Sequence, residues 1–431
     1  MAILPQELVD YTLDFLHTSV PSLSSSSLVS RSWLPATRYH LFRIPVLYQV
    51  SFERGPKNNI NSFIELLKSP LCTFRHTIQG CVLNIEFKEQ LRKCVDTLAT
   101  HTTITGPLLI TQSCGTSCRH DLGIPQKFPL MRSFVFSYRS DEWMSDFRHL
   151  VISLAHIENL AVFTNIGVGV RWPLPDSSTL SSVLPFTPSS VLPNLRTLRL
   201  RMFNPSEFLQ WMLNLGGYTP HIETLDIVIC HDYRTGWGLI DSLKPFLVAN
   251  RYSLKHLSLG MEYGYNIHHN SHGQFPQRLH IGSLPNLRSL SLQTHDVVAL
   301  CKTTTSFLRK HPFTLEVLTL NIAPFIFLDE SYDEAHFRST IRETLDPEIF
   351  ARKVIRFDLN IMCLIFPCED DLDKAETLSR DLLPGWEGLG KLTVKVVQGR
   401  KSQVDSLERI NGTIWGTRIV PFKELRRVGT L

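Results

Sequence analysis

One hydrophobic pattern recurs along most of the chain beyond residue 50. It reads apolar-x-x-apolar-x-apolar, which is short enough for one strand, and the clearest copies start roughly 30 residues apart. Self-similarity at that period indicates a solenoid of stacked repeats. The clearest copies are Leu195-x-x-Leu198-x-Leu200, Ile222-x-x-Leu225-x-Ile227, Leu254-x-x-Leu257-x-Leu259, Leu287-x-x-Leu290-x-Leu292 and Leu315-x-x-Leu318-x-Leu320. Weaker copies start at Met131, Ile157 and Val354, and end copies are expected at residues 82–87, 108–111 and 392–397.

Helical periodicity follows several of these strand patterns. Apolar residues lie on one helical face in residues 141–156, 205–215, 239–247 and 297–308. Strands that alternate with helices, without tight hairpin signals between them, favour parallel pairing. The pattern therefore predicts an α/β fold built as an irregular parallel β/α solenoid. A conventional α/β sheet domain is the alternative.

In each clear copy, the residues between the leucines should point away from the core, because side chains alternate along a strand. The middle column is Arg199, Asp226, Ser258, Ser291 and Thr319, and the next column is Arg201, Val228, Gly260, Gln293 and Asn321. Arg196, Arg199 and Arg201 form a local basic spot that could bind an acidic or phosphorylated peptide. A solvated strand face is the alternative interpretation of these arginines.

The first forty residues follow a different pattern. Leu8, Val9, Leu13 and Leu16 recur at helical spacing, with Tyr11 and Phe15 beside them, and Pro5 suits the first helical position. A short serine-rich helix should follow Val20-Pro21, and a third helix should begin near residues 30–32, so that Pro35 lies in its first turn. Three helices of this size cannot bury all their apolar side chains, so some should meet a partner or the rest of the chain.

The N-terminal segment resembles the F-box family over residues 2–43. The matching residues are Leu4-Pro5-Gln6-Glu7-Leu8, then Leu28-Val29-Ser30-Arg31-Ser32-Trp33, then Leu41-Phe42. The resemblance implies docking on the Skp adaptor of a cullin-based ubiquitin ligase, with the remaining chain holding an unknown protein substrate. The residues expected to face the adaptor, or to support those that do, are Leu4, Pro5, Leu8, Leu13, Leu28, Val29 and Trp33.

The repeated body looks like the leucine-rich-repeat family over residues 75–400. That family places Asn or Cys three positions after the third leucine, where only Asn165 and Cys230 match here, so the pattern is leucine-rich-repeat-like. The expected domains are F-box helices at 1–43, a linker and the first solenoid helix at 44–75, and the solenoid with its C-terminal cap at 76–431.

Composition is typical of a soluble globular protein, with 43% hydrophobic and 19% charged residues. The net charge is only +4, and Lys and Arg are scattered along the chain, so the sequence shows no clustered basic stripe of the kind that binds nucleic acid. No window approaches the ~20 apolar residues of a membrane span, and the first residues do not resemble a signal peptide. We therefore expect a cytoplasmic or nuclear protein that binds neither nucleic acid nor membrane.

No catalytic motif occurs in the sequence. The nine cysteines show no disulfide framework and are expected to be free, buried thiols. Cys114, Cys118 and His120 are spaced like metal ligands, but no fourth ligand follows at the usual spacing, although Cys72, Cys81 or Cys94 could fold back to supply one. The chain is therefore expected to be no enzyme and to need no cofactor or metal. A protein-binding scaffold without a ligase, whose head packs on its own solenoid, and an enzyme without a recognisable motif are the alternatives.

Overall fold

The computed structural model divides into two compact units. The N-terminal unit comprises Met1–Met202 and Trp211–His221, and the C-terminal unit comprises Phe203–Gln210 and Ile222–Leu431. The structure describes residues 5–16, 19–52, 55–85, 87–111, 122–138, 151, 153–154, 156–164, 192–202, 205–214, 221–230, 236–262, 281, 284–294, 297–310, 314–322, 339, 343, 347–363 and 392–398.

The N-terminal unit begins with three short helices, α1 (Gln6–Leu16), α2 (Val20–Ser26) and α3 (Leu34–Phe42). We call these helices and their connections the head. Its sheet follows in the order β2-β1-β3-β4-β5-β6-β7. The strands are β1 (Val46–Phe52), β2 (Gly55–Asn58), β3 (Cys81–Ile85), β4 (Pro107–Thr111), β5 (Ser133–Tyr138), β6 (Asn159–Thr164) and β7 (Thr197–Met202). Its further helices are α4 (Ile60–Lys68), η1 (Arg75–Thr77), α5 (Lys88–His101) and α6 (Ile124–Lys127).

The C-terminal unit continues the same strand-then-helix order. Its sheet runs β8-β9-β10-β11-β12-β13. The strands are β8 (Thr224–Cys230), β9 (His256–Glu262), β10 (Ser289–Thr294), β11 (Leu315–Ile322), β12 (Val354–Cys363) and β13 (Leu392–Gln398). The helices are α9 (Gly236–Ala249), α11 (Val297–Lys310) and α13 (Pro347–Lys353), and α8 (Pro205–Asn214) contributes residues to both units.

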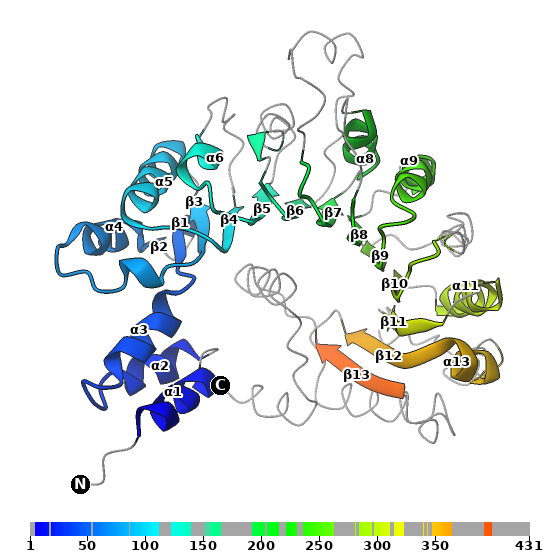
Figure 1. Ribbon diagram of the computed structural model, residues 1–431, viewed down its shortest axis with the longest axis horizontal. Helices are drawn as coiled ribbons and strands as arrows, with labels where there is room; N and C mark the ends of the chain where they lie inside the picture. Colours follow the sequence, from blue (N-terminus) through cyan, green and yellow to red (C-terminus); the bar gives the residue numbers. More distant parts are fainter. Residues whose placement is uncertain are drawn as a thin grey trace. The chain divides into compact units, whose positions relative to one another are not determined.

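Strand pairing is parallel within both units, except where β1 pairs antiparallel with β2. Apart from the head, the helices of each unit lie on one side of its sheet (Figure 1). We call the opposite side the open face. From β3 onward the strand order follows chain order, so both units fit the expected parallel β/α repeat, and this coarse prediction of the fold class is confirmed.

Leucines of the repeat build the core by standing in register from strand to strand. Leu257 aligns with Leu225 and Leu290, and Leu259 aligns with Ile227 and Leu292. All of these side chains are buried. Parallel register repeats the same packing against the helices in each strand, and this explains why the sequence repeats at the period of one strand and one helix.

Residues 44–75 differ from the expected linker. They contain β1 and β2 as well as the expected helix, α4. Leu47, Val50 and Phe52 have the apolar spacing of the later copies, so the pattern could have revealed β1, but the segment was assigned to the linker. All three end copies form strands, namely β3, β4 and β13. Most of the helix expected at 141–156, with Asn165, lies outside the described residues.

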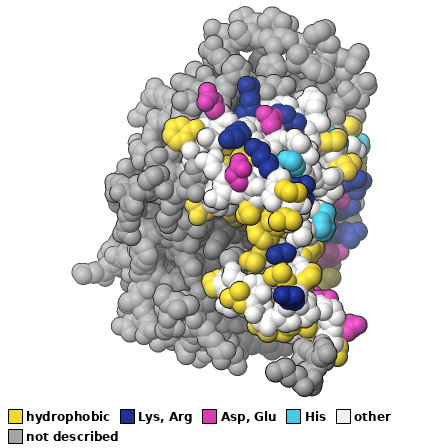
Figure 2. Space-filling view, turned by 90° about the vertical axis from the view of Figure 1, so that its left-hand side faces the viewer, with side chains coloured by type: hydrophobic (Ala, Val, Ile, Leu, Met, Phe, Trp, Pro, Cys, Tyr) yellow, Lys and Arg dark blue, Asp and Glu magenta, His cyan; other side chains and the backbone are white. Residues whose placement is uncertain are grey.

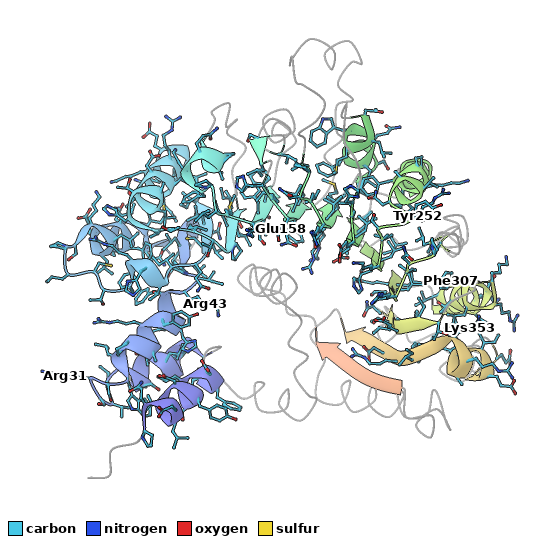
Figure 3. The ribbon with its side chains drawn as sticks, viewed as in Figure 1. Arg31, Arg43, Glu158, Tyr252, Phe307 and Lys353 are labelled. Atoms are coloured by element: carbon cyan, nitrogen blue, oxygen red, sulfur yellow. The ribbon has the colours of Figure 1, made fainter. Side chains whose placement is uncertain are left out.

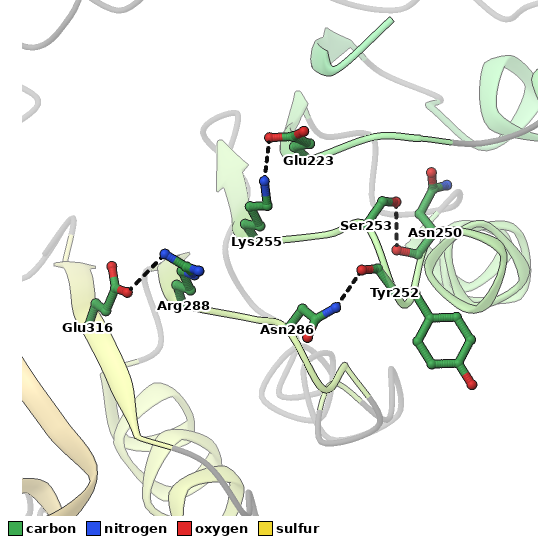
Figure 4. Close-up of polar contacts among 8 residues, drawn as sticks. All are labelled: Glu223, Asn250, Tyr252, Ser253, Lys255, Asn286, Arg288 and Glu316. Carbon is green, nitrogen blue, oxygen red and sulfur yellow. Dashed lines mark hydrogen bonds and ion pairs between the residues drawn. The ribbon is translucent and has the colours of Figure 1, made fainter. Parts of the chain in front are cut away.

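Charged side chains line the sheet where successive strands begin. Lys255 Nζ lies 2.8 Å from Glu223 Oε2, and Arg288 Nη1 lies 3.4 Å from Glu316 Oε1 (Figure 4). In the N-terminal unit, Arg132 pairs with Glu158 in the same way. The backbone repeats too, because the carbonyl of Glu223 accepts the N–H groups of Lys255 at 2.8 Å and His256 at 2.9 Å. Opposite charges on neighbouring repeats thus support the parallel register, by up to about 1 kcal/mol for each exposed pair.

Candidate protein interface

The head has a small core of its own. Val9 and Leu13 of α1 and Leu23 of α2 are at most 1% exposed, and Leu16, Trp33, Ala36 and Leu41 pack against them. The cluster takes its α1 residues from one face of that helix. Apolar side chains on the other faces of α1 are not covered by it. The core therefore holds the three helices together without hiding all their apolar side chains.

Hydroxyl groups hold the serine-rich second helix. Ser19 caps α2 by accepting a hydrogen bond from the N–H of Ser22 at 3.3 Å, and Pro21 lies in the first turn. The hydroxyls of Ser26 and Ser27 donate to the backbone carbonyls of Ser22 and Ser24 at 2.8 and 2.6 Å. These contacts satisfy polar side chains locally, so the serine run is compatible with a short packed helix.

The third helix begins later than expected. Its N-cap is Trp33, which makes no side-chain capping bond, and Pro35 lies in the first turn as predicted. Within its first turns, the Thr37 hydroxyl donates to the carbonyls of Trp33 and Leu34, both at 3.0 Å. Trp33 therefore both starts α3 and packs against the core of the head.

Large apolar side chains on α1 face solvent. Leu8 is 52% exposed, Tyr11 63% and Phe15 61%. Their spacing of three and four residues places them on one helical face, and the Tyr11 and Phe15 rings meet edge to face with centroids 5.1 Å apart. We call Leu8, Tyr11 and Phe15 the α1 stripe. Hydrophobic side chains recur over the lower part of Figure 2, where the head lies.

The connection after α2 exposes two more apolar residues. Leu28 is 87% exposed and Val29 is 64% exposed. Both belong to the Leu-Val-x-Arg-x-Trp segment that resembles the F-box. With the α1 stripe they give the head more exposed apolar surface than its folding explains, and exposed apolar patches are typical of protein interfaces.

Acidic groups border the α1 stripe. Glu7, Asp10 and Asp14 are all exposed on the same helix. Gln6 donates to Asp10 at 2.8 Å, and Asp14 Oδ1 lies 3.0 Å from Nε2 of His40 on α3. The side chain of His40 is only 11% exposed, so this pair also links α1 to α3 inside the head.

The structure sorts the predicted interface residues into two groups. Pro5, Leu8, Leu28 and Val29 are exposed, whereas Leu13 is buried and Trp33 half-buried in the core of the head. Leu13 and Trp33 can therefore only support an interface, and Leu4 lies outside the described residues. Sequence reasoning did not select Tyr11 and Phe15, although their spacing from Leu8 indicated a shared face.

A firm joint connects the head to the sheet of the N-terminal unit. The rings of Phe42 and Phe74 stack with centroids 4.0 Å apart, and Arg38 Nη1 donates to Thr73 Oγ1 at 2.7 Å. Arg43 lies between α3 and the first strands (Figure 3), and its Nε donates to Gln79 Oε1 at 2.8 Å. The head is therefore packed on the first repeat through α3, while the α1 stripe stays exposed.

The second predicted surface lies on and beside β7. Arg199 and Arg201 alternate with the buried Leu198 and Leu200, so they point to the open face, and both are half-buried. Arg196 is exposed and precedes the strand, where its backbone N–H donates to the carbonyl of Glu158 at 2.9 Å. The structure thus places two of the three arginines on the open face and the third at its edge.

Reactive groups are scarce among the described residues. Among the described cysteines, Cys72, Cys81, Cys94 and Cys301 form no disulfide, as the sequence predicts; three of them are buried, and Cys72 is half-buried. Burial raises the pKa of Cys94 to about 12, and burial, reinforced by Cys94, also raises the pKa of Cys81. These two thiols stay protonated at neutral pH and are poor nucleophiles.

Metal ligands and membrane spans were also sought in the described part of the chain. No group of His, Cys, Asp or Glu side chains there could hold a metal ion. Cys114, Cys118 and His120 lie outside the described residues. None of the described helices combines the length and the hydrophobicity needed to cross a bilayer.

Compared with known proteins, the chain matches no family model, and no curated protein matches it. The resemblances to the F-box and leucine-rich-repeat families therefore rest on the residues quoted above. What the geometry adds is an exposed apolar face on a small helical head.

Proposed function

We propose that this protein is the substrate-recognition subunit of a Skp–cullin–F-box ubiquitin ligase, acting in the cytoplasm or nucleus. The head docks on the Skp adaptor, and through it on a cullin, and the solenoid holds a protein substrate. The observation that supports this proposal most is the α1 stripe, because Leu8, Tyr11 and Phe15 stay exposed although α1 has a buried stripe of its own. The F-box-like residues Leu28 and Val29 are exposed as well.

Docking would gain its free energy from burying these side chains. Removing a large apolar side chain from water contributes roughly 1.5–3 kcal/mol. Interfaces commonly concentrate their binding energy in a few buried aromatic anchors, and Tyr11 and Phe15 are the aromatic members of the stripe. Leu13 and Trp33 would act indirectly, by holding α1 and the α2–α3 connection in place.

The protein itself performs no bond chemistry in this proposal. It raises the effective concentration of substrate lysines near the ubiquitin-carrying arm of the ligase, and a stiff connection makes that concentration better defined. The stacked Phe42 and Phe74 rings and the Arg43–Gln79 contact provide such a connection between the head and the first repeat.

The same joint supports a second candidate function. A protein-binding scaffold without a ligase would also pack its head on its own solenoid, as α3 does here. The two proposals differ in the α1 stripe, which a self-contained scaffold leaves without a use. They also differ in one observable, because the scaffold would not co-purify with a Skp adaptor.

A matched pair of double variants tests the proposed function. Leu8→Asp with Val29→Asp introduces charge on two exposed residues of the head, and Leu66→Asp with Leu71→Asp does so at residues that are 50% and 85% exposed outside it. Each full-length variant is co-expressed with the Skp adaptor and purified. The head variant should lose the adaptor, while the control should retain it. Undiminished co-purification of the head variant would refute the proposal.

A further inference from the structure

One helix of the C-terminal unit has an apolar outer face. Four exposed apolar residues lie in the described part of α9 and the turn that follows it, namely Pro245, Val248, Ala249 and Tyr252. Val248 is 50% exposed and Tyr252 is 66% exposed. The spacing of the four residues places them on one side, opposite the buried Leu243 and Phe246. We call these four residues the α9 stripe.

The exposed residues of α11 and α13 are charged instead. They are Lys302, Arg309 and Lys310 on α11, and Glu348 and Arg352 on α13. A charged outer face is usual for a helix that covers a sheet with its apolar face. The α9 stripe departs from this rule within the same unit, and exposed apolar faces of this kind are typical of sites that contact other proteins.

The turn after α9 fixes the position of Tyr252. The buried side chain of Asn250 accepts the N–H of Ile222 and donates to the carbonyl of Phe246, and Asn286 donates to the carbonyl of Tyr252. Tyr252 lies beside α9, and its ring points away from the strands (Figures 3 and 4). An aromatic side chain on a fixed backbone loses little conformational freedom on binding, so Tyr252 suits the role of an interface anchor.

Two cations border the α9 stripe on one side. Lys244 and Arg251 are both exposed, and their spacing of seven residues places them along the same edge, next to Val248. Arg251 Cζ lies 4.4 Å from the centroid of the Tyr252 ring, and this cation–π contact holds the guanidinium beside the stripe. Within the described part of the chain, neither cation forms an ion pair. Their charges therefore favour an acidic partner.

We infer that the α9 stripe binds an amphipathic helix of another protein, which carries acidic residues along one border of its apolar face. The apolar side chains of that helix pack on Val248 and Tyr252, and its carboxylates pair with Lys244 and Arg251. Residues 245–252 span about 12 Å, so two to three turns of the partner helix cover them, with apolar residues at positions i, i+3, i+4 and i+7.

A protein helix fits the stripe better than an anionic membrane does. Helices that lie in a membrane surface insert several large apolar side chains. The α9 stripe has only one large side chain, that of Tyr252, and the small side chain of Ala249 lets a helix backbone approach closely. The inference goes beyond the proposed function, because it names a second contact surface that acts whether or not the head binds an adaptor.

Selection from a phage-displayed library of helical peptides tests the inference with the full-length protein. Enriched peptides should combine an apolar stripe with acidic residues, and their affinity is then measured by fluorescence anisotropy. Tyr252→Asp should weaken binding at least about 10-fold, because it replaces the aromatic anchor with a carboxylate. Lys244→Glu with Arg251→Glu should also weaken it at least about 10-fold. A peptide with Lys in place of its acidic residues should restore binding to that variant.

Lys302→Glu with Lys310→Glu is the matched control, because it makes the same change of charge at two exposed residues of α11. It should leave peptide affinity unchanged, and the thermal midpoints of all variants should match the wild type. Equal losses in the two charge variants would overturn the inference. It would also be overturned if no peptide were enriched, or if the enriched peptides bound Tyr252→Asp as tightly as the wild type.

Two measurements test the other possible occupants of the stripe. Sedimentation velocity should show no self-association of the wild type that Tyr252→Asp abolishes, because such association would assign the stripe to a second copy of the chain. Vesicles containing phosphatidylserine should show no binding that Tyr252→Asp abolishes, because such binding would assign the stripe to a membrane. Either result would overturn the inference.

The head variant separates this inference from the proposed ligase function. Leu8→Asp with Val29→Asp should lose the adaptor and still bind the selected peptides with wild-type affinity. Peptide binding without adaptor binding in the wild type would overturn the ligase proposal alone. Adaptor binding without peptide binding that depends on Tyr252 would overturn the inference alone.

Discussion

The head and the sheet of the N-terminal unit differ in how far their large apolar side chains are buried. Phe134 and Leu198, in the core of the sheet, are fully buried, whereas Tyr11 and Phe15 on α1 are more than 60% exposed. Both regions have a hydrophobic core, so the difference does not come from a failure of the head to fold. It comes from α1, which has one apolar stripe in the core of the head and a second one that faces solvent.

That contrast distinguishes folding from function within a single helix. Val9 and Leu13 hold the head together, while Leu8, Tyr11 and Phe15 contribute little to its core. Substitutions of the two stripes should therefore separate loss of stability from loss of partner binding. The predictions below test this separation and the structure around it, starting with the largest expected effect.

Two phenylalanines give the sharpest difference in stability. Phe134→Ala should lower the free energy of unfolding by about 3–5 kcal/mol, because it removes a fully buried ring. Phe15→Ala should change it by less than about 0.5 kcal/mol, since that ring already faces solvent. Urea denaturation of both full-length variants measures the difference. Similar losses would mean that the α1 stripe serves folding after all.

The joint between head and sheet should depend on Phe74. Its ring stacks on Phe42 and is 7% exposed, so Phe74→Ala should cost about 3 kcal/mol and release α3 from the first repeat. Limited trypsin digestion should then cut after Arg43 at least about 30-fold faster than in the wild type. Leu71→Ala, at a residue that is 85% exposed, is the control and should digest like the wild type. An unchanged rate in Phe74→Ala would show that the stacked rings do not hold the joint.

A pair of asparagines tests polar contacts in the C-terminal unit (Figure 4). Asn250 is 1% exposed, accepts the N–H of Ile222 at 3.0 Å and donates to the carbonyl of Phe246 at 2.9 Å. Asn250→Ala should therefore cost about 1–3 kcal/mol, because the N–H of Ile222 loses its partner, whereas the carbonyl of Phe246 still accepts the backbone N–H of residue 250. Asn286 is exposed and donates to the Tyr252 carbonyl, so Asn286→Ala should cost clearly less. Equal midpoints of chemical denaturation would contradict this ranking.

The smallest expected effect is a pH dependence at His256. Burial lowers the pKa of His256 below the ordinary value of 6.5. The positive charges of Arg288 and Lys255 also lower this pKa, whereas the negative charges of Glu316 and Glu223 raise it. The unfolded chain then binds the proton more readily, so this residue should reduce stability as pH falls through 6.5 and have no effect well above it. His256→Gln should remove that part of the pH dependence in thermal melts between neutral and mildly acidic pH. An identical pH profile for both proteins would show that His256 does not contribute.

Most strands of the sheet could be predicted from the sequence, because their core leucines and other apolar residues recur at one spacing. Strand β1 was missed although Leu47, Val50 and Phe52 have the spacing, because the segment follows the head directly and was assigned to a linker. Its antiparallel partner β2 carried no hairpin signal. The charged pairs were also overlooked. They were visible in principle, because residues 223, 255, 288 and 316 hold the same position of the repeated motif and vary in charge.

The candidate interface was predicted less completely than the fold. A match to Leu-Pro-x-Glu-Leu and Leu-Val-x-Arg-x-Trp identifies positions but does not say which side chains are buried. Leu13 and Trp33 proved to be in or against the core, whereas Tyr11 and Phe15 proved to be exposed. A helical wheel offers several apolar stripes on α1, and only packing with α2 and α3 decides which of them becomes the core.

The most direct test of the central claim is the affinity of the purified full-length protein for the Skp adaptor, measured by isothermal titration calorimetry. Phe15 and Phe87 are 61% and 54% exposed, so Phe15→Asp and Phe87→Asp make the same change on the head and outside it. Docking through the α1 stripe predicts that Phe15→Asp weakens binding by about 30-fold or more, as expected for the loss of an interface hot spot. Phe87→Asp should bind like the wild type. Equal affinities of all three proteins, or no binding by the wild type, would contradict the account.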